Sequence, residues 1–278
     1  MFPLRDTNPT RRTPYVTLGL IAANVLIFLF WQPTFGAGEN PELAQQTFFW
    51  CHGEIPYEVT HQTSLADGGA EAAPAIRADY PGVPPRQLQA HLARECPQKS
   101  WLASLFVSMF LHGGWLHLAG NVLFLWIFGN NIEDRLGTVR FVLFYLLGGV
   151  AAAALQIVFS PDSTIPNVGA SGAIAAVLGA YIVLYPRARV TTAVFFFLIT
   201  LIELPAMVVL GIWFVLQLFD GVGGLGADVN GGVAYFAHVG GFVFGAAVAA
   251  LFLRDRGARR LPAPPPGAWP PDDRWRPY

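Results

Sequence analysis

Two residues of this sequence have side chains suited to nucleophilic catalysis, Ser171 and His238. Ser171 stands between small residues, and His238 lies near the start of a long apolar stretch. A serine hydroxyl becomes an effective nucleophile when a base accepts its proton, and histidine, which titrates near neutral pH, suits that task. The two residues predict acyl-transfer chemistry such as peptide hydrolysis, if the fold brings them together.

A second polar pair, His117 and Asn121, is suited to stabilising negative charge. The two residues are four positions apart and therefore share one face of a helix. Amide hydrolysis develops an oxyanion that needs hydrogen-bond donors. Asn121, His117 and the backbone N–H of Ser171, at a helix N-terminus, are the candidates. No Asp or Glu occurs at a matching depth in these helices, so we predict a Ser–His dyad and not a triad.

The composition puts these residues in a membrane. Of 278 residues, 54% are hydrophobic and 13% are charged, whereas a soluble domain is about a quarter charged. The formal net charge of −1 gives no reason to expect a nucleic-acid partner. Nucleotide and calcium motifs are absent from the sequence, and His52 beside Cys51 makes no adequate zinc set, so we predict no cofactor and no metal.

Six apolar stretches are candidates for spanning helices and predict an all-α polytopic membrane protein. They are Tyr15–Trp31, Trp115–Gly129, Phe141–Phe159, Ser171–Tyr185, Pro205–Phe219 and Ala234–Phe252. Arginines lie at the N-terminus, in the second and fourth connections and after the last stretch, whereas the third and fifth connections contain no Lys or Arg. By the positive-inside rule, both termini are predicted to be cytoplasmic.

The predicted organisation has three parts. Residues 1–14 form a cytoplasmic N-terminus, residues 15–253 a membrane domain, and residues 254–278 a cytoplasmic Pro-rich tail, of which residues 261–278 are predicted to be disordered. A long first connection, residues 32–100, is predicted to lie outside. There, Cys51 and Cys96 either form a disulfide in an oxidising compartment or remain two unrelated thiols.

The fourth stretch, Ser171–Tyr185, is short for a span. At 1.5 Å per residue it covers about 22 Å of a hydrocarbon core roughly 30 Å thick. Because Pro186 and two arginines fix its inner end, Ser171 is predicted to lie below the outer surface. The apolar run Val190–Phe219 is too long for one straight span, so we predict a helix start at Pro205, with residues 190–202 at the inner interface.

The polar residues lie in the first turns of helices that are predicted to run inward, so His117, Ser171 and His238 share one depth. Considered singly, Ser171 is typical of helix packing in membranes, as is the Gly241-x-x-x-Gly245 pattern. Ionisable residues inside membrane segments usually mark a functional site. The joint occurrence at one depth therefore favours chemistry over packing.

Four motifs together resemble the rhomboid family of intramembrane serine proteases. They are His112-x-x-x-x-His117-x-x-x-Asn121, Gly169-Ala170-Ser171-Gly172, Ala237-His238-x-x-Gly241-x-x-x-Gly245 and Glu133-Asp134-Arg135-Leu136-Gly137. The resemblance implies a six-helix rhomboid-like bundle with a short central fourth helix. It also implies Ser171 as nucleophile, His238 as base, and Asn121 and His117 as oxyanion donors.

The resemblance assigns supporting roles as well. It implies that Glu133 and Arg135 tie the loop after the second helix together. In some relatives an aromatic residue one turn after the serine stacks on the histidine, but this chain has Ala175 there. The implied substrates are transmembrane helices of other proteins in the lipid bilayer, cut near their outer end. The implied setting is a bacterial inner membrane, with the active site open to the periplasmic side and the fifth helix and its Gly-rich loop as a gate.

Two other functions fit parts of the pattern. A catalytically silent rhomboid-like protein would bind membrane proteins without cutting them, although inactive relatives usually lose the serine or histidine that this chain retains. A proton-coupled transporter would use His117 and His238 as relays, although the sequence has neither matching halves nor a carboxylate at their depth.

Overall fold

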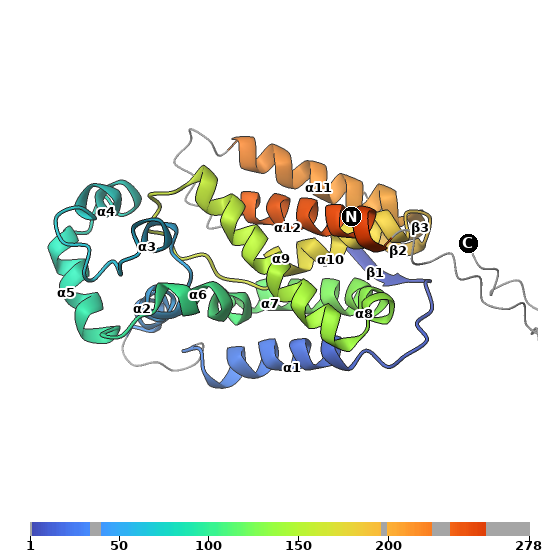
Figure 1. Cartoon of the computed structure of the whole chain (residues 1–278), viewed down its shortest axis with the longest axis horizontal. Coiled ribbons are helices and arrows are strands. Elements are labelled where there is room, and N and C mark those ends of the chain that lie inside the picture. Colours follow the sequence, from blue (N-terminus) through green and yellow to red (C-terminus); the bar gives the residue numbers. More distant parts are fainter. Residues whose placement is uncertain (1, 34–39, 196–198, 224–233, 254–278) are drawn as a thin grey trace, which may run out of the picture.

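The computed structural model describes residues 2–33, 40–195, 199–223 and 234–253, and these residues are mostly helical (Figure 1). The predicted tail, residues 254–278, and most of the Gly-rich fifth loop, residues 224–233, lie outside the described residues. Apolar helices run along the long axis of the molecule. A group of short helices lies at one end of that axis and a small sheet at the other.

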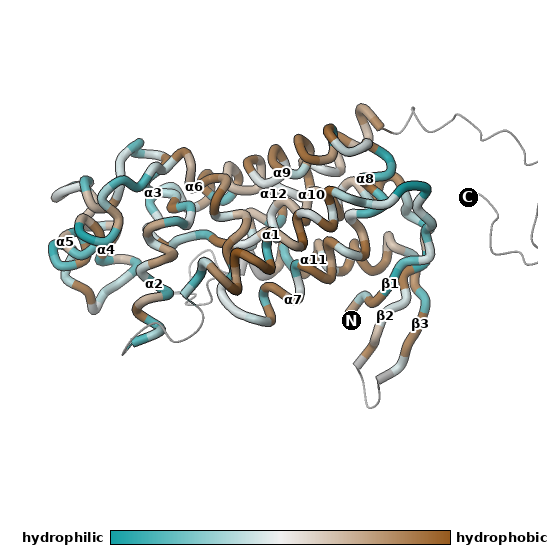
Figure 2. The backbone as a smooth tube through the Cα atoms, turned by 90° about the horizontal axis from the view of Figure 1, so that it is seen from below, coloured by the Kyte–Doolittle hydropathy of each residue, from teal (hydrophilic) through white to brown (hydrophobic). Residues whose placement is uncertain are grey.

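Helices occupy all six of the apolar stretches. They are α1 (Tyr15–Phe30), α7 (Trp115–Phe124) continued by η2 (Leu125–Gly129) and α8 (Asn130–Leu136), α9 (Thr138–Phe159), α10 (Ser171–Leu184), α11 (Ala206–Gly223), and α12 (Tyr235–Val248) continued by η3 (Ala249–Leu253). Figure 2 shows that apolar residues predominate along these helices. The chain is thus a polytopic helical membrane protein.

By length and composition, two of these helices can cross a membrane among the described residues, Thr138–Phe159 and Tyr235–Leu253. A third candidate consists of Trp101–Phe110 and Trp115–Leu136, two segments that meet at 80°. The first segment comprises α6 (Trp101–Val107) and η1 (Ser108–Phe110). The other three apolar helices, Tyr15–Phe30, Ser171–Leu184 and Ala206–Phe219, are shorter. The predicted number of six spans therefore remains a prediction.

Helix α10 forms the centre of the core. Its residues from Ala173 to Tyr181 are all buried, and it packs mainly against α12 and α9. Its 14 residues cover about 21 Å at 1.5 Å per residue. A short central helix that is surrounded by longer ones can begin inside the protein, and this determines where Ser171 lies.

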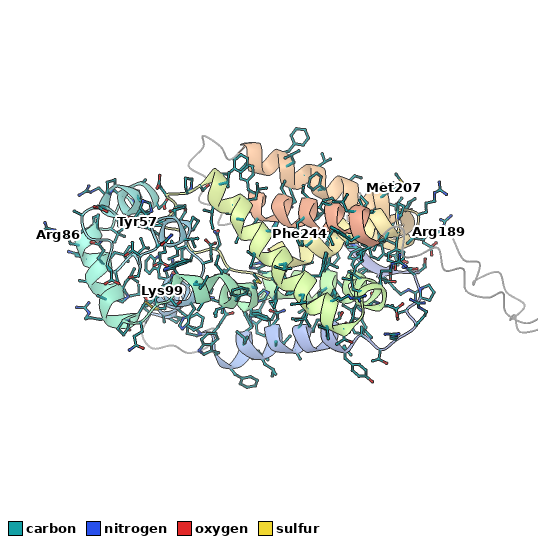
Figure 3. All side chains as sticks on the ribbon, viewed as in Figure 1. Tyr57, Arg86, Lys99, Arg189, Met207 and Phe244 are labelled. Carbon is teal, nitrogen blue, oxygen red and sulfur yellow. A yellow bond between two sulfur atoms is a disulfide. The ribbon has the colours of Figure 1, made fainter. Side chains whose placement is uncertain are left out.

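The first connection folds around a small core of its own. It contains α2 (Pro41–His52), α3 (Pro56–His61), α4 (Ala73–Asp79) and α5 (Pro85–Glu95). Its buried side chains are Trp50, Ile55, Tyr57, Leu65, Ala72, Ile76, Leu88 and Leu92. Figure 3 shows Tyr57 and Lys99 at this end and Arg189 at the opposite end. We call residues 40–100 the first-loop subdomain.

Covalent and ionic links hold the base of the first-loop subdomain. Cys51 and Cys96 are joined by a disulfide. Lys99 Nζ lies 2.6 Å from Glu58 Oε2, with both side chains buried, and donates to the Trp50 carbonyl at 2.7 Å. Burial lowers the pKa of Lys99 and raises that of Glu58, so each charge depends on the other for its stabilisation.

We expect the disulfide to stabilise this subdomain against local unfolding. The cysteines are 45 residues apart, and closing a loop of that length is worth about 4 kcal/mol in the chain-entropy model. The double variant Cys51→Ser/Cys96→Ser should lose hydrogen-exchange protection in residues 40–100, whereas α9 and α10 should stay protected. Reductant should reproduce this loss in wild type and have no effect on the variant. Unchanged protection in the variant would contradict the prediction.

A three-stranded antiparallel sheet lies at the other end of the molecule and corrects the all-α prediction. Its order is β1 (Phe2–Asp6), β2 (Arg189–Phe195) and β3 (Ile199–Pro205). The stretch predicted to lie along the inner interface therefore contributes two antiparallel strands, and the N-terminal residues add a third strand to them. Pro205 ends β3, and α11 begins at the next residue. Thr192 in β2 is fully buried, whereas a polar side chain of a segment that lay on the membrane surface would be exposed.

Glu133 and Arg135 join different helices near the sheet. Glu133 accepts hydrogen bonds from the backbone N–H groups of Val16 and Thr17 at 2.9 and 2.8 Å, which satisfies free donors at the start of α1. Arg135 Nη2 donates to the carbonyl of Leu253 at 2.5 Å, at the end of η3. These two residues fix the ends of the first and last apolar helices, a wider role than tying together one loop.

Candidate active site

Ser171 and His238 lie in direct contact where α10 and α12 begin. Ser171 is the first residue of α10, and His238 is in the first turn of α12. Ser171 Oγ lies 2.8 Å from His238 Nε2, within hydrogen-bond distance. The nucleophile and base proposed from sequence are therefore adjacent, although 67 positions separate them.

Glycines allow the two helices to approach this closely. A Cβ atom at Gly241 would lie 2.1 Å from the carbonyl oxygen of Gly172, and one at Gly245 would lie 1.8 Å from that of Ala176. A Cβ at Gly172 itself would meet the Cβ of Ala152 in α9 at 2.6 Å. The predicted packing role and the predicted chemistry are thus compatible, because the glycine contacts bring α12 against Ser171.

His117 lies beside Gly169, in the segment that leads into Ser171, and a hydrogen bond indicates which of its ring nitrogens carries the proton. The backbone N–H of Gly113 donates to His117 Nδ1 at 3.2 Å, so in the neutral ring the proton lies on Nε2. Gly169 has φ +135°, and a Cβ there would lie 2.8 Å from His117 Nε2 and 3.4 Å from Ser171 Oγ. A glycine at this position allows an N–H donor of His117 to face the space around the nucleophile.

Asn121 and His112 support this side of the site. Asn121 is buried, and its side-chain amide donates to the His117 carbonyl at 3.0 Å within α7. The His112 ring is fully buried, with its centroid 5.2 Å from that of His117. Gln32, at the end of α1, both accepts from the His112 N–H at 2.8 Å and donates to its carbonyl at 2.9 Å. The structure thus connects Asn121 and His112 to His117, and of these three residues His117 is the one that lies against Gly169, just before Ser171.

Two side chains of α11 that were not predicted as site residues also contact His238. Gln217 Oε1 lies 2.5 Å from His238 Nδ1. The Trp213 ring lies 5.8 Å from the His238 ring between centroids, inclined by 39°. An aromatic ring therefore neighbours His238 from a different helix, although Ala175 follows the serine. The available signal for Gln217 was its polarity inside an apolar helix.

A small cavity of about 50 Å³ adjoins Ser171 and reaches the first-loop subdomain. Its walls include the small residues Gly149 and Ala152, together with Gln156, Asn167 and Glu54. Asn167 Nδ2 donates to Glu54 Oε2 at 2.8 Å, and the two backbones form a β-bridge. Burial raises the pKa of the Glu54 carboxyl to about 7. The first-loop subdomain thereby contacts the segment that leads into Gly169 and Ser171.

Comparisons with known proteins agree with the motifs. A family model described as "Rhomboid domain" matches residues 99–255. The chain is 36% identical over 129 residues to "Rhomboid protease GluP" of Bacillus subtilis, which covers 46% of this chain and 24% of that protein. It is 27% identical over 165 residues to "Rhomboid protein 1, mitochondrial" of Saccharomyces cerevisiae, which covers 58% of this chain and 44% of that protein. The matches span less than half the length of these relatives. Because the family model covers more than half of the chain, the chain belongs to the rhomboid family.

Proposed function

We propose that this protein is an intramembrane serine endopeptidase that uses Ser171 and His238 as a catalytic dyad. The observation that carries the proposal is the 2.8 Å separation of Ser171 Oγ and His238 Nε2, which joins the first turns of α10 and α12. One relative, "Rhomboid protease GluP" of Bacillus subtilis, is named as a protease. The proposed substrates are transmembrane helices of other proteins, and no cofactor takes part in the reaction.

The proposed reaction starts with attack by Ser171 Oγ on a substrate carbonyl carbon, while His238 Nε2 accepts the hydroxyl proton. The carbonyl oxygen becomes an oxyanion, which the Nε2–H of His117, the Ser171 backbone N–H and the Asn121 amide would stabilise. His238 then gives its proton to the leaving amine as the peptide bond breaks. A water molecule, deprotonated by His238, then attacks the acyl carbon, and His238 returns the proton to Ser171 Oγ as the acyl–oxygen bond breaks.

We also propose the membrane arrangement that this reaction needs. All six apolar helices would span the bilayer, the short α10 included, with both termini in the cytoplasm and Ser171 on the side of the first-loop subdomain. The lack of Lys and Arg in the third and fifth connections supports this orientation. A bacterial inner membrane, with the site facing the periplasm, is the setting that we propose.

Reconstitution with a single-span substrate tests the function. Wild-type protein in liposomes should produce two fragments, and mass spectrometry should find that one peptide bond has gained the elements of water. Ser171→Ala should bind the same substrate and leave it intact. Binding without any cleavage by wild type would favour the catalytically silent alternative. Substrate-independent uptake of a solute along a pH gradient would favour the transporter.

We expect His117→Phe to slow the chemical step and leave the fold intact. Phenylalanine keeps an aromatic ring beside Gly169 but removes the Nε2–H donor. Loss of one oxyanion donor lowers kcat about 10²-fold to 10³-fold. Steady-state cleavage assays should show this fall in kcat with little change in KM, and the thermal unfolding midpoint should stay near that of wild type. An unchanged kcat would exclude His117 as a donor.

A further inference from the structure

Gln217 makes a contact that the Ser–His dyad leaves unexplained. It is a polar side chain in α11, and two of its neighbours, Leu216 and Leu218, are exposed on the surface of the bundle. A polar group in an apolar helix costs free energy unless it finds a partner. The Gln217 side chain is half-buried, and its Oε1 lies 2.5 Å from His238 Nδ1.

The contact determines which nitrogen of His238 carries the proton. A neutral imidazole has one N–H donor and one acceptor nitrogen. An amide oxygen only accepts, so Gln217 Oε1 requires the proton on Nδ1. The Nε2 lone pair then faces Ser171 Oγ at 2.8 Å, in the state that can accept the serine proton. The opposite tautomer would present an N–H to Ser171 and could not act as a base.

No carboxylate performs this task in the part of the chain that the structure describes, because no Asp or Glu side chain there hydrogen-bonds to His238. In a Ser–His–Asp triad, a carboxylate orients the histidine and holds its tautomer. An amide oxygen provides the same orientation through a dipole without bringing a charge into the membrane. It also remains hydrogen-bonded to Nδ1–H when His238 becomes doubly protonated during acylation.

We infer that Gln217 is a positioning residue, which fixes His238 in the Nδ1–H tautomer and orients its Nε2 toward Ser171. The inference rests on the proposed protease function. It makes the site a Ser–His–Gln arrangement in which the third member comes from α11, a helix other than those that carry the reacting groups. Trp213, one turn earlier in α11, adds a ring beside the imidazole.

Three variants test the inference in liposomes with a single-span substrate. Gln217→Met keeps a similar side-chain length but removes the amide oxygen. Gln217→Glu retains an acceptor oxygen at the same distance along the side chain. Leu216→Met introduces the same residue type at the preceding position of α11, where the native side chain is exposed. Kinetics for all three, with Ser171→Ala as the inactive reference, give kcat and KM separately.

We expect Gln217→Met to lower kcat about 10-fold to 100-fold with KM within about twofold of wild type. Gln217→Glu should cut at least about fivefold faster than Gln217→Met, since the acceptor is restored. Leu216→Met should match wild type. A general loosening of α11 would affect both methionine variants and would not be rescued by glutamate, and that result would overturn the inference.

Nitrogen-15 NMR of histidine-labelled protein gives a readout that activity alone does not. His238, identified by loss of its signals in His238→Ala, should show a protonated Nδ1 and an unprotonated Nε2 in wild type, and should shift toward the Nε2–H tautomer in Gln217→Met. An Nε2–H tautomer in folded wild type would overturn the inference without any variant. Wild-type kinetics in Gln217→Met beside an inactive Ser171→Ala would overturn this inference alone, whereas an inactive wild type would overturn the proposed function as well.

Discussion

Replacing Ser171 or His238 by alanine should abolish cleavage, and the double variant should be no worse than either single one. In the proposed mechanism, the Ser171 hydroxyl and the His238 imidazole act in a single proton transfer between atoms that lie 2.8 Å apart. Removing either one removes the same step, so the effects are strongly non-additive. We expect kcat to fall at least about 10⁴-fold in all three variants, measured as initial rates of fragment formation from a single-span substrate.

Non-additivity is the specific result to examine. If each single variant lost activity and the double variant lost the product of both factors, Ser171 and His238 would act in separate steps and the dyad would be wrong. Ser171→Cys serves as a control for packing, because a thiol occupies a volume similar to that of the hydroxyl. It should leave the thermal unfolding midpoint unchanged.

The second large effect concerns the fold, at Gly245. A Cβ there would lie 1.8 Å from the backbone oxygen of Ala176, which cannot move without displacing α10. Overpacking a well-filled core costs 1–3 kcal/mol and more when backbone must shift, so we expect Gly245→Ala to lower the free energy of unfolding by at least about 3 kcal/mol. Because the same contact brings α12 toward Ser171, cleavage should fall as well.

Gly211→Ala is the matched control for this substitution. Gly211 lies in α11, and a Cβ there would have no atom within 4 Å. The change should alter stability by no more than about 1 kcal/mol and leave cleavage intact. Thermal and chemical unfolding in detergent would measure both variants. Equal stabilities of Gly245→Ala and Gly211→Ala would show that α10 and α12 are not packed as described.

The positions of the apolar helices were predictable from the sequence, and so was the contact between Ser171 and His238. Each helix begins or ends within a few residues of its predicted boundary, because long apolar runs are interrupted by polar, Gly or Pro residues. The shortness of the Ser171–Leu184 helix was predictable because Pro186 ends the apolar stretch that begins at Ser171. The serine and histidine could be paired because each lies in the first turn of a helix that was predicted to run inward.

The sheet could not be predicted in the same way. Residues 190–202 are apolar without a clear alternation, and a short apolar run does not distinguish a strand from a buried helix or an interfacial segment. Its edge partner, β1, is supplied by residues 2–6 at the far end of the sequence. Glu203, two residues before the predicted helix start at Pro205, lies on β3, and its Oε2 is 4.0 Å from Arg189 Nη1 at an exposed position.

Gln217 was missed for a different physical reason. Its role depends on which nitrogen of His238 it faces, and the position of α11 around α12 determines that contact. Spacing in one chain does not give the rotation of one helix relative to another. The bond between Glu54 and Asn167 likewise joins residues 113 positions apart, and spacing along the chain does not indicate such a contact.

Activity-based labelling tests the central claim most directly. A fluorophosphonate reacts with a serine only when a base has activated its hydroxyl, and peptide mapping identifies the modified residue. We predict a single adduct on Ser171 in wild-type protein, none in Ser171→Ala, and none in His238→Ala although Ser171 is still present. Absence of any adduct in well-folded wild type, or labelling of Ser171 that persists in His238→Ala, would contradict a catalytic dyad of these two residues.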